Sequence, residues 1–436
     1  MRRQRGAVFV YCLVVLAALV AVLAAVESTV RIDVRSATNR VQEIKARQAC
    51  LSGVQRYIAT IANDLKGGGA TTSSGSSTST ISTTSGATTL QDDWAQLGSN
   101  GDENVIVGDC KVRMQVVDAS SLINMSKLTT PWLNRLPLSQ QQIDALNDYT
   151  TPGQTASADG GKDQYYNGLA FPYKPKLAPL DTLDELLQVR YFTASSIWQP
   201  NTNIVSTVTF AAGPNGQQPT LYELLTPYSY SPNVQPGPLG QQQPKINLTA
   251  PISAGTVNRL VGLGLSRVNV VRLQTAPNIR TLGAAAAVFP SIQDKRVILD
   301  SCTYSGATRI SGLINLNTAS QNVLSTVPGI TPNLAQAIVN QQQTGFTKLS
   351  DVLNVPGFTG GALTQTIDSF CVESSTFIVR VIGFCGGTTV AMEATVDIIN
   401  NVPRLTRLAD VPFTDVIGRW NWNSTTSTDT TLKEAS

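Results

Sequence analysis

Five cysteines that follow the apolar N-terminal segment carry the most distinctive chemistry of this sequence. They are Cys50, Cys110, Cys302, Cys371 and Cys385. None forms a CxxC pair, so their spacing argues against a zinc ribbon or a thioredoxin-like redox site. In an extracytoplasmic protein, one or two structural disulfides with one thiol left over are expected. Isolated buried cysteines fit the spacing equally well, and both interpretations stay open.

Histidine is absent from the sequence, which limits the catalytic chemistry that the chain can perform. Histidine is the side chain best suited to acid–base catalysis at neutral pH, and it is a frequent metal ligand. Walker A and GxSxG motifs are absent as well. We therefore predict that the protein is not an enzyme and has no cofactor.

Length and composition set the scale of the fold. The chain has 436 residues, which predicts two or three packed units joined by linkers. Charged residues make up 14%, compared with about 25% in a typical soluble domain, so Ser, Thr, Asn and Gln must supply much of the polar surface. The net charge of +3 predicts no strong overall attraction to nucleic acid or acidic lipid.

The N-terminus combines three arginines with an uncharged run over 7–26, which Glu27 ends. At 1.5 Å per residue this run forms a helix of about 30 Å, long enough to cross a bilayer core. The preceding arginines keep that end cytoplasmic and export the rest. A plain signal anchor fits, whereas a cleaved secretory signal would be shorter and end in a small-x-small site. A pilin-like leader, which is a short basic peptide ending in glycine, fits Gly6 followed by Ala7.

The residues after this run favour the pilin-like interpretation. Between 30 and 65, apolar residues recur at steps of three and four, interrupted at Gln48, which predicts one face of a long helix. These residues are Val30, Val34, Ala37, Val41, Ile44, Leu51, Val54, Ile58, Ile61 and Leu65. With the apolar run they predict one helix of roughly sixty residues, whose second half packs on a globular domain.

Runs of β-branched and aromatic residues predict strands near both ends of the chain, separated by a large insertion. These runs are 105–107, 112–117, 376–383 and 388–398. Gly386-Gly387 lies between the last two and predicts a hairpin turn. Residues 413–422 are a candidate final strand, and the Gly/Ser/Thr-rich stretch 67–89 predicts a flexible loop.

The insertion contains an internal helical repeat. One copy begins at 122–124 and the other at 313–315, both with the sequence Leu-Ile-Asn. In the second copy, Pro328-Gly329 predicts the tight turn of a helix-hairpin-helix motif, because glycine can adopt a positive φ. Pro137 marks the same turn in the first copy. Residues 246–250 are a candidate degenerate third start.

Together these features resemble the K-type minor pseudopilins of type II secretion systems. The resemblance depends on the leader, the long helix, the inserted repeats, and the segments Ile-Asn-Leu-Asn-Thr-Ala at 314–319 and Asp-Thr-Leu-Asp-Glu-Leu at 181–186. It implies an α+β fold with a pilin-like long N-terminal helix and a small antiparallel sheet. The sheet is interrupted by a large, mainly helical insertion containing two helix-hairpin-helix/SAM-like repeats.

The resemblance also implies an order of segments along the chain. These are a prepilin leader (1–6), a transmembrane and amphipathic helix (7–66), a loop with the first strands (67–120), a first helical repeat (121–200), an insertion of uncertain fold (201–312), a second helix-hairpin-helix repeat (313–370) and the closing strands (371–425).

By the same resemblance, prepilin peptidase cleaves between Gly6 and Ala7, and the new N-terminus of Ala7 is methylated. The mature chain is implied to sit in the bacterial inner membrane by a single pass, with its body in the periplasm. It joins the I- and J-type minor pseudopilins and the major pseudopilin at the tip of a pseudopilus that acts in protein export. Major pilins carry Glu at the fifth mature position; Tyr11 stands there instead, as expected of the K type.

Some members of this family bind calcium in the helical insertion. The acidic residues in the corresponding part of this sequence are few: Asp148, Asp159 and Asp163. Calcium prefers several oxygen ligands that include carboxylates, so these three are weak candidates, and a polar loop without metal is the expected state.

A membrane-anchored, extracytoplasmic DNA-binding protein of a pilus or DNA-uptake system is the alternative function. Helix-hairpin-helix turns can present backbone amides to phosphates, but that chemistry needs basic residues nearby. Between 313 and 358 the only charged residues are Lys348 and Asp351. This near-neutral repeat predicts protein packing rather than nucleic-acid binding.

Overall fold

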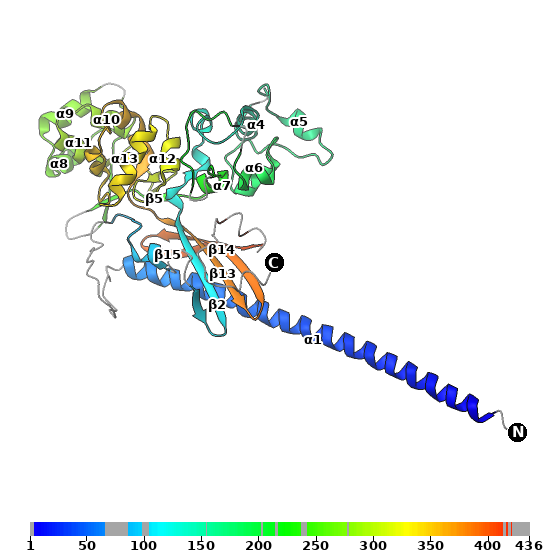
Figure 1. Cartoon of the computed structure of the whole chain (residues 1–436). Helices are drawn as coiled ribbons and strands as arrows, with labels where there is room; N and C mark the ends of the chain where they lie inside the picture. The colour runs from blue at the N-terminus through cyan, green and yellow to red at the C-terminus, as the bar shows by residue number, and fades with distance from the viewer. Residues whose placement is uncertain are drawn as a thin grey trace.

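The computed structural model describes residues 4–65, 86–97, 104–153, 155–201, 204–213, 217–236, 242–276, 279–412, 416 and 420. A long helix, α1 (Gln4–Leu65), runs out from the body toward the N-terminus (Figure 1). Its C-terminal part lies on a sheet, and a larger helical body lies beyond the sheet. The predicted α+β class and the single long helix are both confirmed.

The sheet brings together the two ends of the chain. Its strand order is β1-β2-β13-β14-β15, and every neighbouring pair is antiparallel. The strands are β1 (Asn104–Val107), β2 (Cys110–Asp118), β13 (Thr376–Cys385), β14 (Thr388–Ile399) and β15 (Val402–Val411). Because β2 pairs directly with β13, the chain leaves the sheet for the insertion and returns from it at the same end of this strand pair.

Close approach of two backbones fixes where α1 lies on the sheet. A Cβ added at Gly383 of β13 would lie 2.6 Å from the carbonyl oxygen of Ala46 and 2.8 Å from Cys50 Sγ. A Cβ added at Gly53 of α1 would lie 3.2 Å from a methyl group of Val381. A larger residue at Gly383 would push the helix off the sheet, whereas one at Gly53 would require the valine side chains of the sheet to shift slightly.

The protein's own sheet covers the apolar residues of α1 only in the second half of the helix. The side chains buried against the sheet are Ala46, Ala49, Cys50, Val54, Tyr57 and Ile61. In contrast Val30, Val34, Val41 and Ile44 are all more than half exposed. Helical periodicity identifies an apolar face, but it does not say which part of that face the protein's own sheet covers.

The closing hairpin forms as predicted and is followed by a strand that was not predicted. Gly386 and Gly387 have φ of 54° and 91°, which match the left-handed turn that joins β13 to β14. The next turn, Asn400-Asn401, has φ of 52° and 59° and leads into β15. The candidate final strand at 413–422 lies outside the described residues, apart from Val416 and Trp420, and these two are helical, so the prediction of a strand is wrong for them.

The helical body contains three copies of one unit rather than two. Each copy begins with a two-residue Ile-Asn strand that pairs in parallel with a two-residue strand at or shortly after the end of the copy. The pairs are β3 (Ile123–Asn124) with β4 (Leu225–Thr226), β8 (Ile246–Asn247) with β9 (Cys302–Thr303), and β11 (Ile314–Asn315) with β12 (Phe370–Cys371). The candidate start at 246–250 therefore opens a third copy, which occupies much of the insertion whose fold the sequence left uncertain.

Helices fill each copy between its two short strands. The first has α3 (Thr130–Leu133), α4 (Gln140–Thr150), a 3-10 helix (Leu183–Gln188) and α6 (Ala194–Trp198). The second in chain order has α8 (Ala254–Gly262), α9 (Arg267–Thr275), α10 (Leu282–Ala287) and α11 (Ile292–Ser301). The third has α12 (Gln321–Thr326), α13 (Pro332–Gln342), a 3-10 helix (Leu349–Asn354) and α14 (Gly361–Thr366). We call them the first, middle and last copies.

One asparagine shapes the start of every copy. Its side-chain oxygen accepts a hydrogen bond from the backbone N–H two residues later. The distances are 2.9 Å for Asn124 with Ser126, 2.9 Å for Asn247 with Thr249, and 3.0 Å for Asn315 with Asn317. This local bond turns the chain out of the short strand and toward the first helix.

Short elements connect these units. They are α2 (Asp93–Gln96), α5 (Asp163–Asn167), α7 (Leu221–Leu224), β5 (Tyr230–Pro232), β6 (Val234–Pro236), β7 (Gln242–Pro244), β10 (Arg309–Ser311), and 3-10 helices at Ala119–Ser121, Met125–Lys127 and Ile367–Ser369. The three copies share one continuous apolar core, and the sheet with α1 has another.

A buried carboxylate joins these two cores. Asp118, the last residue of β2, accepts hydrogen bonds from Asn315 Nδ2 at 3.0 Å, Thr318 Oγ1 at 2.6 Å and Ser374 Oγ at 2.7 Å. It also accepts one from the backbone N–H of Ser120 at 2.8 Å. These donors come from the turn that follows β2, from the last copy and from the segment that re-enters the sheet, so Asp118 fixes their junction.

Replacing Asp118 by alanine should strongly destabilise this junction, because several buried donors would lose their acceptor. We expect a decrease of about 3 kcal/mol in the free energy of unfolding. Denaturant titration of Asp118→Ala beside Asp109→Ala, whose carboxylate is exposed, measures the difference. Equal midpoints for the two variants would contradict the junction role.

Candidate assembly site

The N-terminal two-thirds of α1 is not covered by the rest of the described chain. Its large apolar side chains from Phe9 to Val26 are all more than half exposed. In the described residues, α1 is the one helix long and apolar enough to cross a membrane. A continuous apolar surface of this size must be covered by lipid or by other helices.

A groove runs beside α1 where the helix meets the sheet. It is lined by Arg35, Asn39 and Glu43 of α1 and by Gly387 and Thr388 at the β13–β14 turn. The exposed residues Val30, Val34 and Val41 lie on the same stretch of helix. This part of α1 therefore offers an apolar stripe next to charged groups, a composition suited to helix–helix contacts.

The predicted processing residues lie at the far end of α1. Gly6 and Ala7 are part of the helix, and Tyr11, at the fifth position after them, is 72% exposed. In the structure, the described body lies far from this end of the helix (Figure 1).

The structure pairs two of the five candidate cysteines. Cys110 and Cys385 form a disulfide that connects the β1–β2 turn with the end of β13. Cys50, Cys302 and Cys371 are buried free thiols. Burial raises the pKa of both the Cys50 and the Cys302 thiols to about 12 and raises that of Cys371 as well. These three thiols stay protonated and are poor nucleophiles.

The three acidic candidates for calcium do not come together as a site. Asp148 accepts hydrogen bonds from Ser157 N at 2.8 Å and from Ser157 Oγ at 3.0 Å. Asp159 and Asp163 are half-buried, and the described residues contain no group of three acidic, cysteine or histidine side chains able to hold a metal.

The ammonium group of Lys162 binds backbone carbonyls of the loop that follows α4. Lys162 is 6% exposed, and its Nζ donates to the carbonyl oxygens of Asp148 and Thr151, both at 2.6 Å. Gly160 passes so close to Asp148 that an added Cβ would lie 1.7 Å from the carboxylate. The loop is thus closed by hydrogen bonds alone, and these residues do not fit a calcium ion.

Replacing Lys162 by methionine should loosen this loop, because two buried carbonyls would lose their donor. We expect the free energy of unfolding to fall by about 2 kcal/mol, while Lys174→Met, at an exposed position, should change it little. Thermal denaturation measures both variants. The native chain should show the same midpoint with millimolar calcium as with a chelator, and a calcium-dependent rise would contradict this account.

The two predicted hairpin turns pack against each other. Arg135, just before Pro137, donates to the carbonyl oxygen of Ser325 at 2.7 Å and to that of Ile330. These carbonyls flank Pro328 and Gly329, and Gly329 has the predicted positive φ, at 96°. An added Cβ at Gly329 would meet the Thr366 methyl group at 2.9 Å. Arg135 therefore links the two turns through the carbonyls beside Pro328 and Gly329, while Gly329 itself is exposed.

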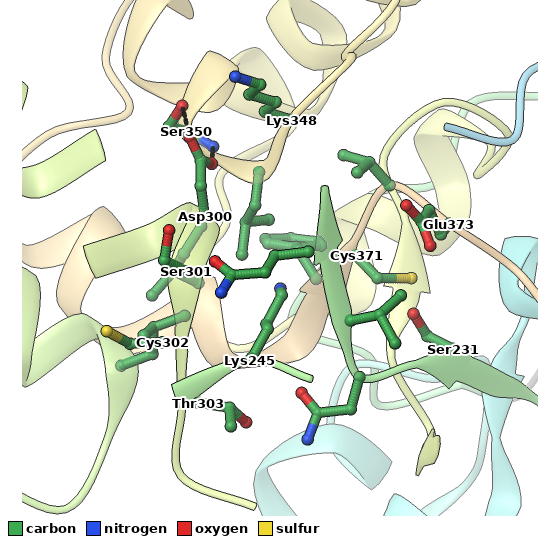
Figure 2. A pocket seen from close by; sticks show the side chains of 18 of the residues that line it. Ser231, Lys245, Asp300, Ser301, Cys302, Thr303, Lys348, Ser350, Cys371 and Glu373 are labelled. Atoms are coloured by element: carbon green, nitrogen blue, oxygen red, sulfur yellow. Dashed lines mark hydrogen bonds between the residues drawn. The ribbon is translucent and has the colours of Figure 1, made fainter. Parts of the chain in front are cut away.

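A cavity of about 700 Å³ lies between the middle and last copies (Figure 2). Lys245 lies centrally in it, with the Cys302 and Cys371 side chains on either side. Asp300 accepts hydrogen bonds from Ser350 N at 2.9 Å and from Ser350 Oγ at 2.8 Å, which ties α11 to the last copy. The cavity therefore lies at the interface between the middle and last copies.

Glu373 at the edge of this cavity should make stability depend on pH. Burial raises the pKa of its carboxyl from 4.5 to about 8, although the nearby Lys245 charge opposes the shift. Protonated Glu373 therefore contributes its full share to the free energy of unfolding below pH 4.5. This contribution falls as the pH rises from 4.5 to about 8.

Glu373→Gln should therefore match the native protein near pH 4 and exceed it at pH 8. We expect the gain at the higher pH to be on the order of 3 kcal/mol in the free energy of unfolding. Denaturant titrations across this range measure it, with the exposed change Glu43→Gln as control. A difference that does not vary with pH would contradict the assignment.

Comparisons with known proteins place two parts of the body in families. Residues 126–200, in the first copy, match the family model of type II secretion system protein K. That match supports a minor pseudopilin of the protein K type. Residues 311–371, the last copy, match the helix-hairpin-helix motif. The predicted resemblance to the K-type minor pseudopilins is thereby confirmed, and so is the helix-hairpin-helix repeat.

Two individual proteins are also similar to this chain. One is endonuclease/exonuclease/phosphatase family domain-containing protein 1 of Xenopus laevis, which is 33% identical over 84 residues. That match covers 19% of this chain and 15% of the relative, so the chain spans only a small part of that protein's length. The other is a chain in the crystal structure of the GspK-GspI-GspJ complex from the enterotoxigenic Escherichia coli type 2 secretion system. It is 11% identical, with a TM-score of 0.45, over 86% of this chain and 98% of that one.

The middle copy is the main feature that sequence reasoning did not resolve. It lies outside both family matches. Its Ile-Asn start at 246–247 was the available signal. The helices that follow lack the Pro-Gly turn of the last copy and use Gly264 instead, with φ of 105°.

Proposed function

We propose that this chain is the tip subunit of a type II secretion pseudopilus and acts in protein export through assembly rather than catalysis. The observation that carries the proposal is the protein K domain at 126–200, borne on a chain whose α1 leaves a long apolar face uncovered. The partners proposed for that face are the I- and J-type minor pseudopilins and the major pseudopilin.

Assembly would proceed through α1. The run before Glu27 partitions into the inner membrane, and the exposed stripe from Val30 to Ile44 then packs on helices of neighbouring subunits. The groove beside Arg35 and Glu43 gives polar contacts that set the register of this packing.

The position of the body supports placement at the end of a filament. The three helical copies lie beyond the sheet at the C-terminal end of α1 (Figure 1). Under this proposal, the copies occupy the side of the sheet where a further subunit would otherwise stack. The Cys110–Cys385 disulfide suits an oxidising compartment, which agrees with a periplasmic body.

Processing of the leader tests this proposal directly. Prepilin peptidase should cleave the native chain between Gly6 and Ala7, so the N-terminal peptide from native membranes should begin with methylated Ala7. Gly6→Asp should keep the full leader and lose secretion in cells that depend on this gene copy, whereas Gln4→Ala should behave as native. Mass spectrometry of the N-terminal peptide distinguishes the cleaved from the uncleaved chain, and an intact Met1 in the native chain would refute the proposal.

A further inference from the structure

Charge is distributed unevenly over the three copies. Residues 246–303, the middle copy, contain six basic and two acidic residues, for a net charge of +4. The last copy, 314–371, has one lysine and two aspartates. The small net charge of the whole chain therefore does not reveal that the middle copy is basic, and a basic surface attracts anionic partners.

Helix α9 gathers this charge around an apolar centre. At about 100° per residue, five exposed residues fall on one arc of about 140° in the order Arg267, Val271, Thr275, Val268, Arg272. Val268 is 72% exposed and Val271 is 54% exposed. The two arginines flank the two valines. We call this arc the α9 face.

The α9 face is fixed in place by the opposite side of the helix. Val270 and Leu273 are buried in the core of the body. Asn269 donates to Asp294 Oδ2 at 2.9 Å, which ties α9 to α11. The face is therefore rigidly presented, and its exposure does not come from fraying.

The arginines of the α9 face are available to a ligand. Within the residues that the structure describes, the guanidinium groups of Arg267 and Arg272 make no hydrogen bond and no ion pair. The neighbouring turn is open as well, because a Cβ added at Gly262 or Gly264 would meet nothing within 4 Å. Leu263 in that turn and Ile292 of α11 are also exposed apolar residues of the middle copy, at 39% and 48%.

We propose that the α9 face docks on an anionic phospholipid surface. A helix with an apolar centre and basic flanks lies in the plane of a bilayer interface, where valines enter the headgroup boundary and arginines bind phosphates. Nucleic acid would use the arginines but would gain nothing from burying Val268 and Val271. Helix α9 lies at the opposite end of the molecule from the N-terminal part of α1 (Figure 1), so its exposed face would meet a different membrane surface. The proposal goes beyond pseudopilus assembly and does not depend on leader processing.

The test uses the full chain held in phosphatidylcholine nanodiscs, so that α1 is already occupied. These discs are floated with vesicles of phosphatidylglycerol and phosphatidylcholine, or of phosphatidylcholine alone. We expect recovery with the anionic vesicles only, and less recovery as salt is raised. Equal flotation with both vesicle types, or with neither, would overturn the proposal.

Two pairs of substitutions separate the charge from the apolar contact. Arg267→Gln with Arg272→Gln should weaken binding about 25-fold, because each arginine near an anionic surface contributes about fivefold. Val268→Ser with Val271→Ser should weaken binding while leaving its salt dependence unchanged. Arg56→Gln with Lys174→Gln, at exposed positions elsewhere, is the matched control and should bind as native.

A fluorescent DNA duplex supplies the competing partner. Under the proposal, the duplex binds at least tenfold more weakly than the anionic vesicles, and the valine pair does not alter that weak binding. If the duplex binds as tightly as the vesicles and the valine pair leaves vesicle binding intact, the surface is a phosphate-binding face for nucleic acid and the lipid proposal is wrong.

Discussion

The arrangement of this protein depends on one buried carboxylate at the end of β2. Asp118 stands where the chain leaves the sheet, and Ser374 stands where the chain returns to it. Asn315 and Thr318 reach Asp118 from the last helical copy. A buried charge is tolerated only when hydrogen bonds satisfy it, so the sheet and the body can dock in only one way. Arg309 with Asp397, and Tyr222 with Glu393, add further links between the body and the sheet.

The three copies show how little sheet is needed to organise a helical repeat. Each copy closes on itself with a pair of two-residue parallel strands, beginning at Ile123, Ile246 or Ile314. Their isoleucines are buried in the shared core, while the following asparagine turns the chain. With this scaffold kept constant, the surfaces of the copies have diverged. One copy matches protein K, one uses its hairpin turn for internal packing, and one carries the basic α9 face.

The long helix divides the molecule into a part that folds by itself and a part that needs other surfaces. From Ala46 onward, α1 is buried on its own sheet, and Gly53 and Gly383 permit the close approach. Before that point its apolar residues have no cover within the described chain. Such a helix is stable as secondary structure because of its length, but its burial must come from lipid or neighbouring subunits. This division is what suits the chain to a membrane-anchored filament.

Local patterns in the sequence determined the long helix, the strands at both ends, the Gly386-Gly387 turn and the last helix-hairpin-helix copy. Each of these depends on periodicity or on a turn residue whose backbone preference acts over a few positions. Tertiary structure decided the pairing of Cys110 with Cys385, because two residues that are 275 positions apart meet only when β2 and β13 are neighbours. It also decided which part of α1 is buried, and that the ammonium of Lys162 closes the loop after α4. The middle copy was determined partly by local sequence and partly by tertiary structure. Its Ile-Asn start is visible in the sequence at 246–247. The parallel strand at 302–303 that pairs with it is set by long-range packing, which no local pattern encodes.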